Sequence, residues 1–157
     1  MKAYNTLSVF PDVPPLFEHL RQEDNAHIHA AIFSNGTSDM IHATLDESPD
    51  LRPHRELFKD VVLVEGVGRF KPAPEVYTHL LSTVHKTHHE QDVWLISGNP
   101  FDVVGANAVG LRTCWVDRSG AGWTDKLVEG DKGRPNIIVS GLHEVVGKVA
   151  GYGAGSG

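Results

Sequence analysis

The chain has 157 residues, of which 40% are apolar and 22% charged, and its formal net charge is −6. These values are typical of one globular domain, and the acidic balance argues against nucleic acid or an anionic membrane as a partner. A single cysteine excludes an internal disulfide, and no apolar run approaches the roughly 20 residues that span a bilayer. Residues 1–6 contain no signal-peptide core. We therefore expect a soluble, cytoplasmic protein, with one domain over residues 1–150 and a flexible glycine-rich tail over residues 151–157.

Helices are predicted where apolar residues recur every three or four positions, and strands where a short apolar run ends at turn residues. In chain order, the sequence predicts a helix at Val13–Arg21, a strand at Ile28–Phe33, a helix from Thr37 or Ser38 to about Leu45, a loop at Pro49–Pro53, a strand at Val61–Val64, a helix from Pro74 to about His85, a strand at Asp92–Ile96, a helix at Phe101–Val109, strands at Arg112–Val116 and Asn136–Val139, and a helix at Leu142–Ala150. Because each strand is a continuous apolar run between helices, the pattern indicates a parallel sheet covered on both faces, which is a three-layer α/β/α fold.

Polar side chains follow the first predicted strand, in the stretch Ser34-Asn35-Gly36-Thr37. A helix is predicted to begin directly after it, and the free N–H groups of a helix N-terminus favour an anion. The same residues also fit a capped turn that binds nothing, because Thr37 or Ser38 can cap the helix. In a parallel sheet the ligand site lies at the carboxyl ends of the strands, so this loop is a candidate site.

Two further loops carry charged side chains. Lys71 stands in a proline-rich stretch that stiffens its position, where it can neutralise a carboxylate or a developing anion; the alternative is a solvated loop lysine. Ser97, Asn99 and Asp102 bring a hydroxyl, an amide and a carboxylate within one turn after a predicted strand. Here the alternative is simple helix capping by Asn99. Three such loops at one sheet edge favour a site over three coincidences.

Other reactive residues have simpler explanations. His85, His88 and His89 lack a carboxylate or cysteine at familiar ligand spacing, so we expect exposed, titrating side chains rather than a metal site. Cys114 lies inside an apolar strand and is expected in the core. The sequence contains no G-x-S-x-G elbow, Walker P-loop or G-x-G-x-x-G motif.

The ordered motifs resemble the haloacid dehalogenase superfamily, and most closely its L-2-haloacid dehalogenase (type II) branch. They are Ser34-Asn35-Gly36, then Phe70-Lys71-Pro72 with Tyr77 six residues after the lysine, then Ser97-x-Asn99-Pro100-Phe101-Asp102, and finally the stretches 105–113 and 115–120. The resemblance runs from about Leu7 to Val146. It implies a Rossmann-like core with a parallel sheet and no cofactor.

The resemblance also implies the chemistry. An aspartate attacks the carbon that bears the halogen, and water then hydrolyses the ester. Ser34 would bind the substrate carboxylate, Asn35 the leaving halide, and Lys71 the attacking carboxylate, supported by Ser97. Asn99 and Asp102 would position the lysine and the water, and Tyr77 would line the site. The expected ligand is thus a small carboxylate or another anion.

Two departures from the family pattern qualify this expectation. Superfamily phosphatases hold Mg²⁺ with an acidic residue where this chain has Ser97, so the resemblance implies a metal-independent site and makes a phosphatase the less favoured interpretation. Lys2 stands where the nucleophilic aspartate would be, or else residues 7–14 are the end of a cap. On either interpretation we expect the nucleophile, the first strand and the cap to be missing, which leaves an inactive hydrolase or a non-catalytic anion-binding or interaction protein.

The missing strand would lie centrally in the sheet. We therefore expect the strands 28–33 and 93–96 to pair directly with each other, because direct pairing needs the least ordering. We also expect lowered stability and self-association through exposed strand edges.

Overall fold

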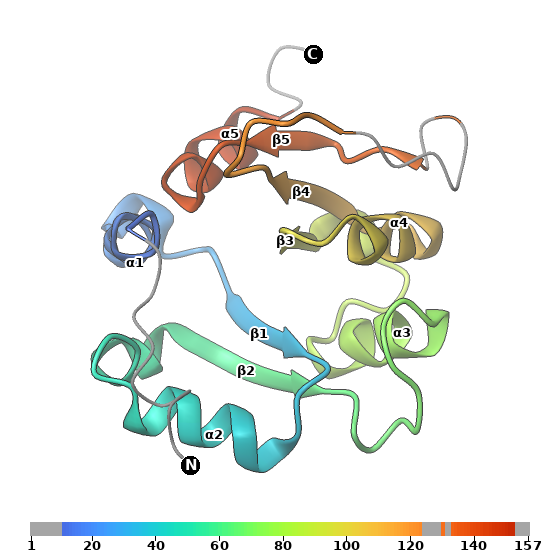
Figure 1. Cartoon of the computed structure of the whole chain (residues 1–157), viewed down its shortest axis with the longest axis horizontal. Helices are drawn as coiled ribbons and strands as arrows, with labels where there is room; N and C mark the ends of the chain where they lie inside the picture. The colour runs from blue at the N-terminus through green and yellow to red at the C-terminus, as the bar shows by residue number, and fades with distance from the viewer. Residues whose placement is uncertain (1–10, 124–129, 131–132, 153–157) are drawn as a thin grey trace.

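The computed structural model describes residues 11–123, 130 and 133–152 of the chain. In this part of the chain the elements follow one another from α1 to α5 (Figure 1). Their bounds are α1 Val13–Arg21, β1 Ala30–Ser34, α2 Ser38–Glu47, β2 Phe58–Leu63, α3 Pro74–Thr83, β3 Trp94–Ser97, α4 Pro100–Val109, β4 Arg112–Val116, β5 Ile137–Val139 and α5 Val145–Gly151. Every strand and helix predicted from the sequence is present, and residues 153–157 of the expected tail lie outside the described residues.

Element boundaries differ from the prediction where charged residues or tight turns interrupt the apolar pattern. Strand β2 begins at Phe58 rather than Val61. The predicted start is late because the charged residues Lys59 and Asp60 interrupt the apolar run in the first half of the strand. The predicted loop at 49–53 runs into a 3₁₀ helix over Arg52–Leu57. The last helix opens with a 3₁₀ turn, Leu142–Glu144, before α5 begins. Gly110, at φ 104°, follows Val109 and ends α4 at the predicted residue.

The expectation that β1 and β3 pair directly is wrong. Among the described strands, β1 pairs in parallel with β2, and β3, β4 and β5 form a second parallel sheet. Paired strands lie about 4.8 Å apart. Here the Lys71 side chain joins the two sheets instead, because its Nζ contacts the Phe33 carbonyl at the end of β1 and the Asp102 carboxylate in α4.

Helices cover both faces of the second sheet. Leu16 of α1 and Val145 of α5 pack on Cys114 and Val116 of β4. On the other face, Leu95 of β3 joins a cluster with residues of α3 and α4. Figure 1 shows α1 and α5 on the left of this sheet and α3 and α4 on its right. The three-layer α/β/α arrangement predicted from the sequence is confirmed.

Two apolar contacts hold the sheets together. Val62 and Val64 at the end of β2 belong to the same buried cluster as Leu95 of β3. Phe17 of α1 is buried and meets the ring of Phe58 edge-on at 5.9 Å. Helix α1 therefore contacts both sheets, since Phe17 meets the first sheet and the adjacent Leu16 packs on the second.

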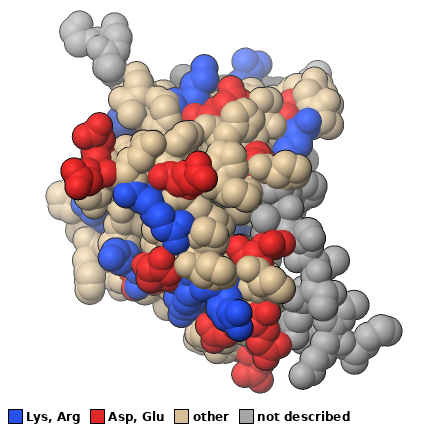
Figure 2. Space-filling model, turned by 90° about the vertical axis from the view of Figure 1, so that its left-hand side faces the viewer, with Lys and Arg blue, Asp and Glu red and all other residues tan. Residues whose placement is uncertain are grey.

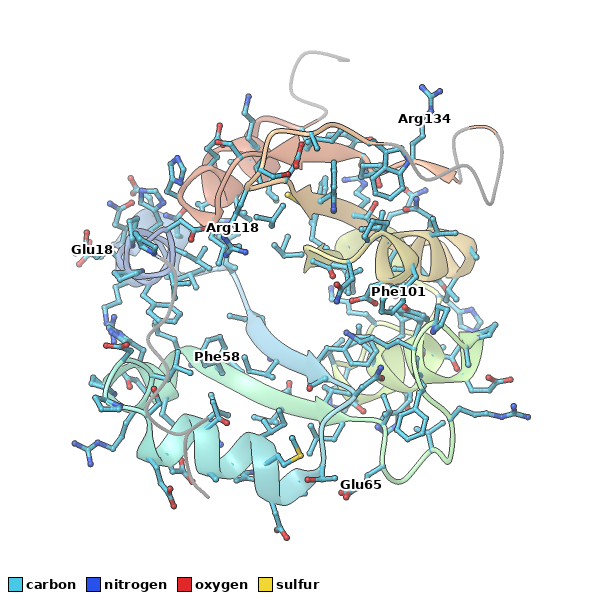
Figure 3. The ribbon with its side chains drawn as sticks, in the orientation of Figure 1. Glu18, Phe58, Glu65, Phe101, Arg118 and Arg134 are labelled. Atoms are coloured by element: carbon cyan, nitrogen blue, oxygen red, sulfur yellow. The ribbon has the colours of Figure 1, made fainter. Side chains whose placement is uncertain are left out.

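The start of α1 is fastened to the second sheet by Asp12. Its carboxylate accepts a hydrogen bond from the Leu142 backbone N–H at 2.6 Å and pairs with Arg118, which Figure 3 labels beside α1. The backbone bond to Leu142 and the bond to Arg118 outweigh burial and lower the pKa of Asp12. The junction before α1 is therefore held by a charged group rather than by apolar packing alone.

Charged side chains of both signs are interspersed on the face that Figure 2 shows. The described ion pairs include Arg21–Glu56, Arg55–Asp46 and Arg118–Asp12. No basic patch dominates this face, in keeping with the acidic net charge. Among the described residues, no helix has the length and apolarity to cross a membrane.

The inner edge of β3 faces away from its partner β4. The Val93 carbonyl accepts a hydrogen bond from the Arg112 N–H of β4, and backbone groups alternate in direction along a strand. The backbone N–H and C=O groups of Leu95 and Ser97 therefore point toward β4. Those of Trp94 and Ile96 point to the opposite side, where β1 lies.

We predict that this alternation is visible in amide hydrogen exchange. The Trp94 and Ile96 amides should exchange faster than the Leu95 amide, by about fivefold, because one backbone hydrogen bond contributes about 1 kcal/mol. Nuclear magnetic resonance of the ¹⁵N-labelled chain in D₂O measures all three rates. Equal protection of the three amides would contradict the prediction, since it would require another segment or another copy to cover this edge.

Candidate active site

The three polar loops predicted from the sequence lie at the carboxyl ends of β1, β2 and β3. Ligand sites of parallel sheets occupy this edge, because the loops that follow the strands converge there. Lys71 follows β2, and Asp102 lies in the first turn of α4, where a negative charge is favoured. Their side chains meet although Lys71 follows a strand of the first sheet and Asp102 follows a strand of the second.

Lys71 and Asp102 form a buried ion pair. Lys71 Nζ lies 3.0 Å from Asp102 Oδ2, and the two side chains are only 11% and 3% exposed. The same ammonium donates to the Phe33 carbonyl at 3.0 Å and lies 4.1 Å from the centre of the Phe33 ring. Two of its three N–H groups thus have described acceptors, which leaves one for a further acceptor. The solvated loop lysine, the alternative to a site residue, is not what the structure contains.

Tyr77 holds the other oxygen of the same carboxylate. Its hydroxyl donates to Asp102 Oδ1 at 2.6 Å, and the residue is completely buried in α3. Burial, followed by the hydrogen bond to Asp102 and by its charge, raises the pKa of Tyr77 well above its ordinary value. The phenol therefore stays protonated and remains a donor. Tyr77 therefore contacts Asp102 from the buried interior and not from a solvent-exposed surface.

The loop after β1 positions the Lys71 backbone. Asn35 Oδ1 accepts a hydrogen bond from the Lys71 N–H at 3.0 Å, so the two loops are joined directly. Ser34 Oγ accepts from the Gly36 N–H at 3.0 Å. That bond uses a lone pair of Ser34, and its hydroxyl hydrogen can still donate to a ligand.

The N-terminus of α2 is occupied by side chains of this chain. Thr37 caps the helix through the Met40 N–H at 3.2 Å, and Glu65 accepts the Ser38 N–H at 3.1 Å. Figure 3 shows Glu65 at the lower end of the loop after β2, beside the start of α2. This helix end was expected to attract an anion, and the Glu65 carboxylate already supplies one. Local sequence carries no sign of this contact, because Glu65 is 27 residues away from Ser38.

The loop after β3 is organised by Ser97. Its Oγ accepts the Asn99 N–H at 3.1 Å, and the Trp115 indole donates to the Gly98 carbonyl at 3.2 Å. Asn99 is the N-cap residue of α4 but makes no side-chain cap bond, and its side chain is exposed. Asn99 is therefore available to a ligand.

The structure joins Asn35, Lys71, Asp102 and Tyr77 into one hydrogen-bonded chain. The described bonds of Ser34, Ser97 and Asn99 stay within their own loops. Sequence reasoning missed Phe33, whose carbonyl and ring both contact Lys71. Its place as the last apolar residue before Ser34 was the available signal.

The remaining reactive residues lie elsewhere. His88 and His89 border a hollow of about 380 Å³ with Glu90, Gln91 and Asp92. No three histidine, cysteine or acidic side chains of the described ranges are grouped so that they could hold a metal ion. Cys114 is buried, and burial, followed by the charge of Glu144, raises the pKa of its thiol to about 12. It is a core residue and a poor nucleophile.

Comparison with known proteins identifies relatives. A family model described as haloacid dehalogenase-like hydrolase matches residues 1–116. Haloacetate dehalogenase H-2 from Moraxella sp. (strain B) is 31% identical over 119 residues, which cover 76% of this chain and 49% of that protein. (S)-2-haloacid dehalogenase 4A from Burkholderia cepacia is 29% identical over 76% of this chain and 48% of its own length. The chain thus spans about half the length of the curated relatives it matches.

Solved structures share the fold. L-2-haloacid dehalogenase from Xanthobacter autotrophicus superposes with a TM-score of 0.76 at 26% identity, covering 96% of this chain and 64% of its own. A HAD phosphatase from Thermococcus onnurineus has a TM-score of 0.66 at 23% identity, covering 92% of this chain and 59% of its own. The second likeness concerns the fold alone.

We predict that Asp102→Ala lowers the free energy of unfolding by about 3–5 kcal/mol, because it leaves the Lys71 charge buried and unpaired. Urea unfolding followed by circular dichroism measures this. Asp92→Ala is the matched control, since Asp92 pairs with Lys86 at 3.2 Å on the surface, where an ion pair contributes about 0–1 kcal/mol after solvent screening. Similar losses in both variants would contradict the assignment of Lys71–Asp102 as a buried, coupled pair.

Proposed function

This chain belongs to the haloacid dehalogenase-like hydrolase family, and we propose that it supplies the lysine-bearing part of a 2-haloacid dehalogenase active site. The observation that carries the proposal is the chain of bonds from Asn35 through Lys71 and Asp102 to Tyr77. It fixes an ammonium group with one N–H to spare at the sheet edge where parallel folds bind ligands. The similarity to proteins named haloacetate and (S)-2-haloacid dehalogenases supports the substrate class.

The proposed reaction is a two-step hydrolysis. A carboxylate attacks the carbon that bears the halogen, so that a C–O bond forms and halide leaves with the electron pair of the C–X bond. Water then adds to the carbonyl of the resulting ester, which returns the carboxylate and releases a 2-hydroxy acid and a proton. Lys71 orients the carboxylate, Ser34 binds the substrate carboxylate, and Asn35 contacts the departing halide. Asn99 and Asp102 position the water and the lysine.

The attacking carboxylate is the group that the described residues do not supply. Asp102 is already held by Lys71 and Tyr77 and is 2% exposed, so it cannot reach a substrate carbon. We propose that the nucleophile belongs to a strand that lies between β1 and β3, where the two sheets are unpaired. The chain by itself is then expected to release no halide.

A metal-independent mechanism is proposed on the donor set of the third loop. Ser97 stands where the superfamily's phosphatases carry an acidic metal ligand, and the Asp102 carboxylate is engaged by Lys71 and Tyr77. Mg²⁺ prefers carboxylate oxygens in a nearly octahedral shell, which this loop does not offer. A phosphatase is correspondingly disfavoured.

A non-catalytic anion-binding protein is the alternative, and two observations weigh against it. Asp102 already balances the charge of Lys71, and Glu65 occupies the N-terminus of α2. An anion would therefore meet little uncompensated positive charge. Calorimetric titration with chloride and with propionate tests this alternative directly, and saturable binding to the chain alone would favour it.

The experiment that tests the function joins this chain to a part of a relative that the alignment with this chain does not cover. We predict that the chain, fused behind the segment of the Moraxella haloacetate dehalogenase that lies outside the aligned 119 residues, releases halide from a haloacetate or an (S)-2-haloacid. Halide-selective electrode measurements follow the reaction with and without EDTA, and EDTA should not change the rate.

Substitutions in that fusion separate the roles. Lys71→Ala should lower kcat/KM by about 10²–10³-fold, the usual effect of removing one group that stabilises charge in a transition state. Lys59→Ala is the matched control, because Lys59 is an exposed lysine on β2. A folded fusion without halide release, or one that keeps its rate without Lys71, would disprove the proposed function.

A further inference from the structure

Gly105 lies in α4 one turn after Asp102, on the face that meets α3 and the loop of Lys71. A Cβ atom added there would stand 2.8 Å from the Tyr77 hydroxyl, 2.9 Å from Tyr77 Cε2 and 2.8 Å from Pro72 Cβ. Ordinary van der Waals contacts of a Cβ atom begin at 3.4 Å. A methyl group at position 105 therefore cannot be accommodated unless its neighbours move.

Neither neighbour can move alone. Tyr77 is completely buried, and its hydroxyl is bonded to Asp102 at 2.6 Å. Pro72 is a ring without a free side-chain torsion, and it follows Lys71 directly, so that a shift of Pro72 carries Lys71 with it. One neighbour of Gly105 is thus Tyr77, which bonds the Asp102 carboxylate. The other, Pro72, is covalently attached to Lys71, which bonds the same carboxylate.

We propose that Gly105 is a positioning residue, whose lack of a side chain lets α4 approach closely enough for Tyr77 and Lys71 to hold Asp102 at the same time. Glycine weakens a helix interior relative to alanine, so a glycine at this point has a local cost that the close approach offsets. The inference concerns the same site as the proposed function, but it is tested by lysine reactivity and stands independently of turnover.

The test compares Gly105→Ala with Gly147→Ala. Gly147 is a helical glycine in α5 with nothing within 4 Å of an added Cβ, so alanine there should improve the helix without disturbing any contact. The measurement is the rate at which acetic anhydride modifies Lys71, followed by mass spectrometry of peptides, with the exposed Lys59 in the same chain as the internal reference.

We expect Gly105→Ala to raise the relative acetylation rate of Lys71 by about tenfold, which corresponds to the loss of one hydrogen bond to a charged group. Gly147→Ala should leave this rate unchanged. Val62→Ala separates positioning from general destabilisation, because Val62 belongs to the same core cluster as Tyr77 but takes no part in the described bonds of Lys71 and Asp102. That variant should melt at a lower temperature while Lys71 stays protected.

An unchanged Lys71 rate in a folded Gly105→Ala variant would overturn the proposal, as would an equal rise in Val62→Ala. Should Gly105→Ala fail to fold, it is prepared together with Tyr77→Phe, which removes the hydroxyl that lies at 2.8 Å. Recovery of folding in the double variant supports the proposal, since neighbouring substitutions that relieve one contact are not additive. A Gly105→Ala variant that is as stable as Gly147→Ala overturns it, because it would show that the close contacts at position 105 carry no constraint.

Discussion

The ion pair between Lys71 and Asp102 is the interaction on which the arrangement of the site depends. It joins a loop that follows one sheet to a helix that follows the other, and Lys71 also takes the last carbonyl of β1. A buried charge pair of this kind is stable only when further hydrogen bonds satisfy both partners. Phe33 and Tyr77 provide those bonds, and Asn35 holds the Lys71 backbone, which explains why the site residues form one connected chain.

The two sheets meet through side chains rather than through backbone hydrogen bonds. Apolar contacts on one side run from Val62 to Leu95 and on the other through Phe17 of α1. Between them lie strand edges that point toward each other without pairing among the described strands. Close packing therefore takes over the positioning that a continuous sheet would supply, and small changes in volume near α3 and α4 act on the site.

The elements were predictable because each strand is an apolar run with a turn at its end, and because Pro74 and Gly110 mark helix limits by backbone geometry alone. The carboxyl-edge loops followed from the same logic, since strand ends of a parallel sheet converge. That β1 and β3 do not pair with each other could not be predicted from local pattern. The contact that links the two sheets at their carboxyl edge is the pair of Lys71 and Asp102, which are 31 residues apart in the sequence.

The same limit explains the parts of the site that sequence reasoning missed. Glu65 occupies the start of α2 across 27 residues, and Phe33 contacts Lys71 across 38; neither spacing has a local signature. Once these contacts are known, the charge of the site is close to balanced, because Asp102 and Glu65 face Lys71 and the positive end of α2. A ligand at this edge therefore gains more from directed hydrogen bonds than from net charge. Lys71 is held by Asn35, Phe33 and Asp102, and its ammonium keeps one N–H group for a further acceptor. It is therefore suited to orient a carboxylate rather than to attract one from solution.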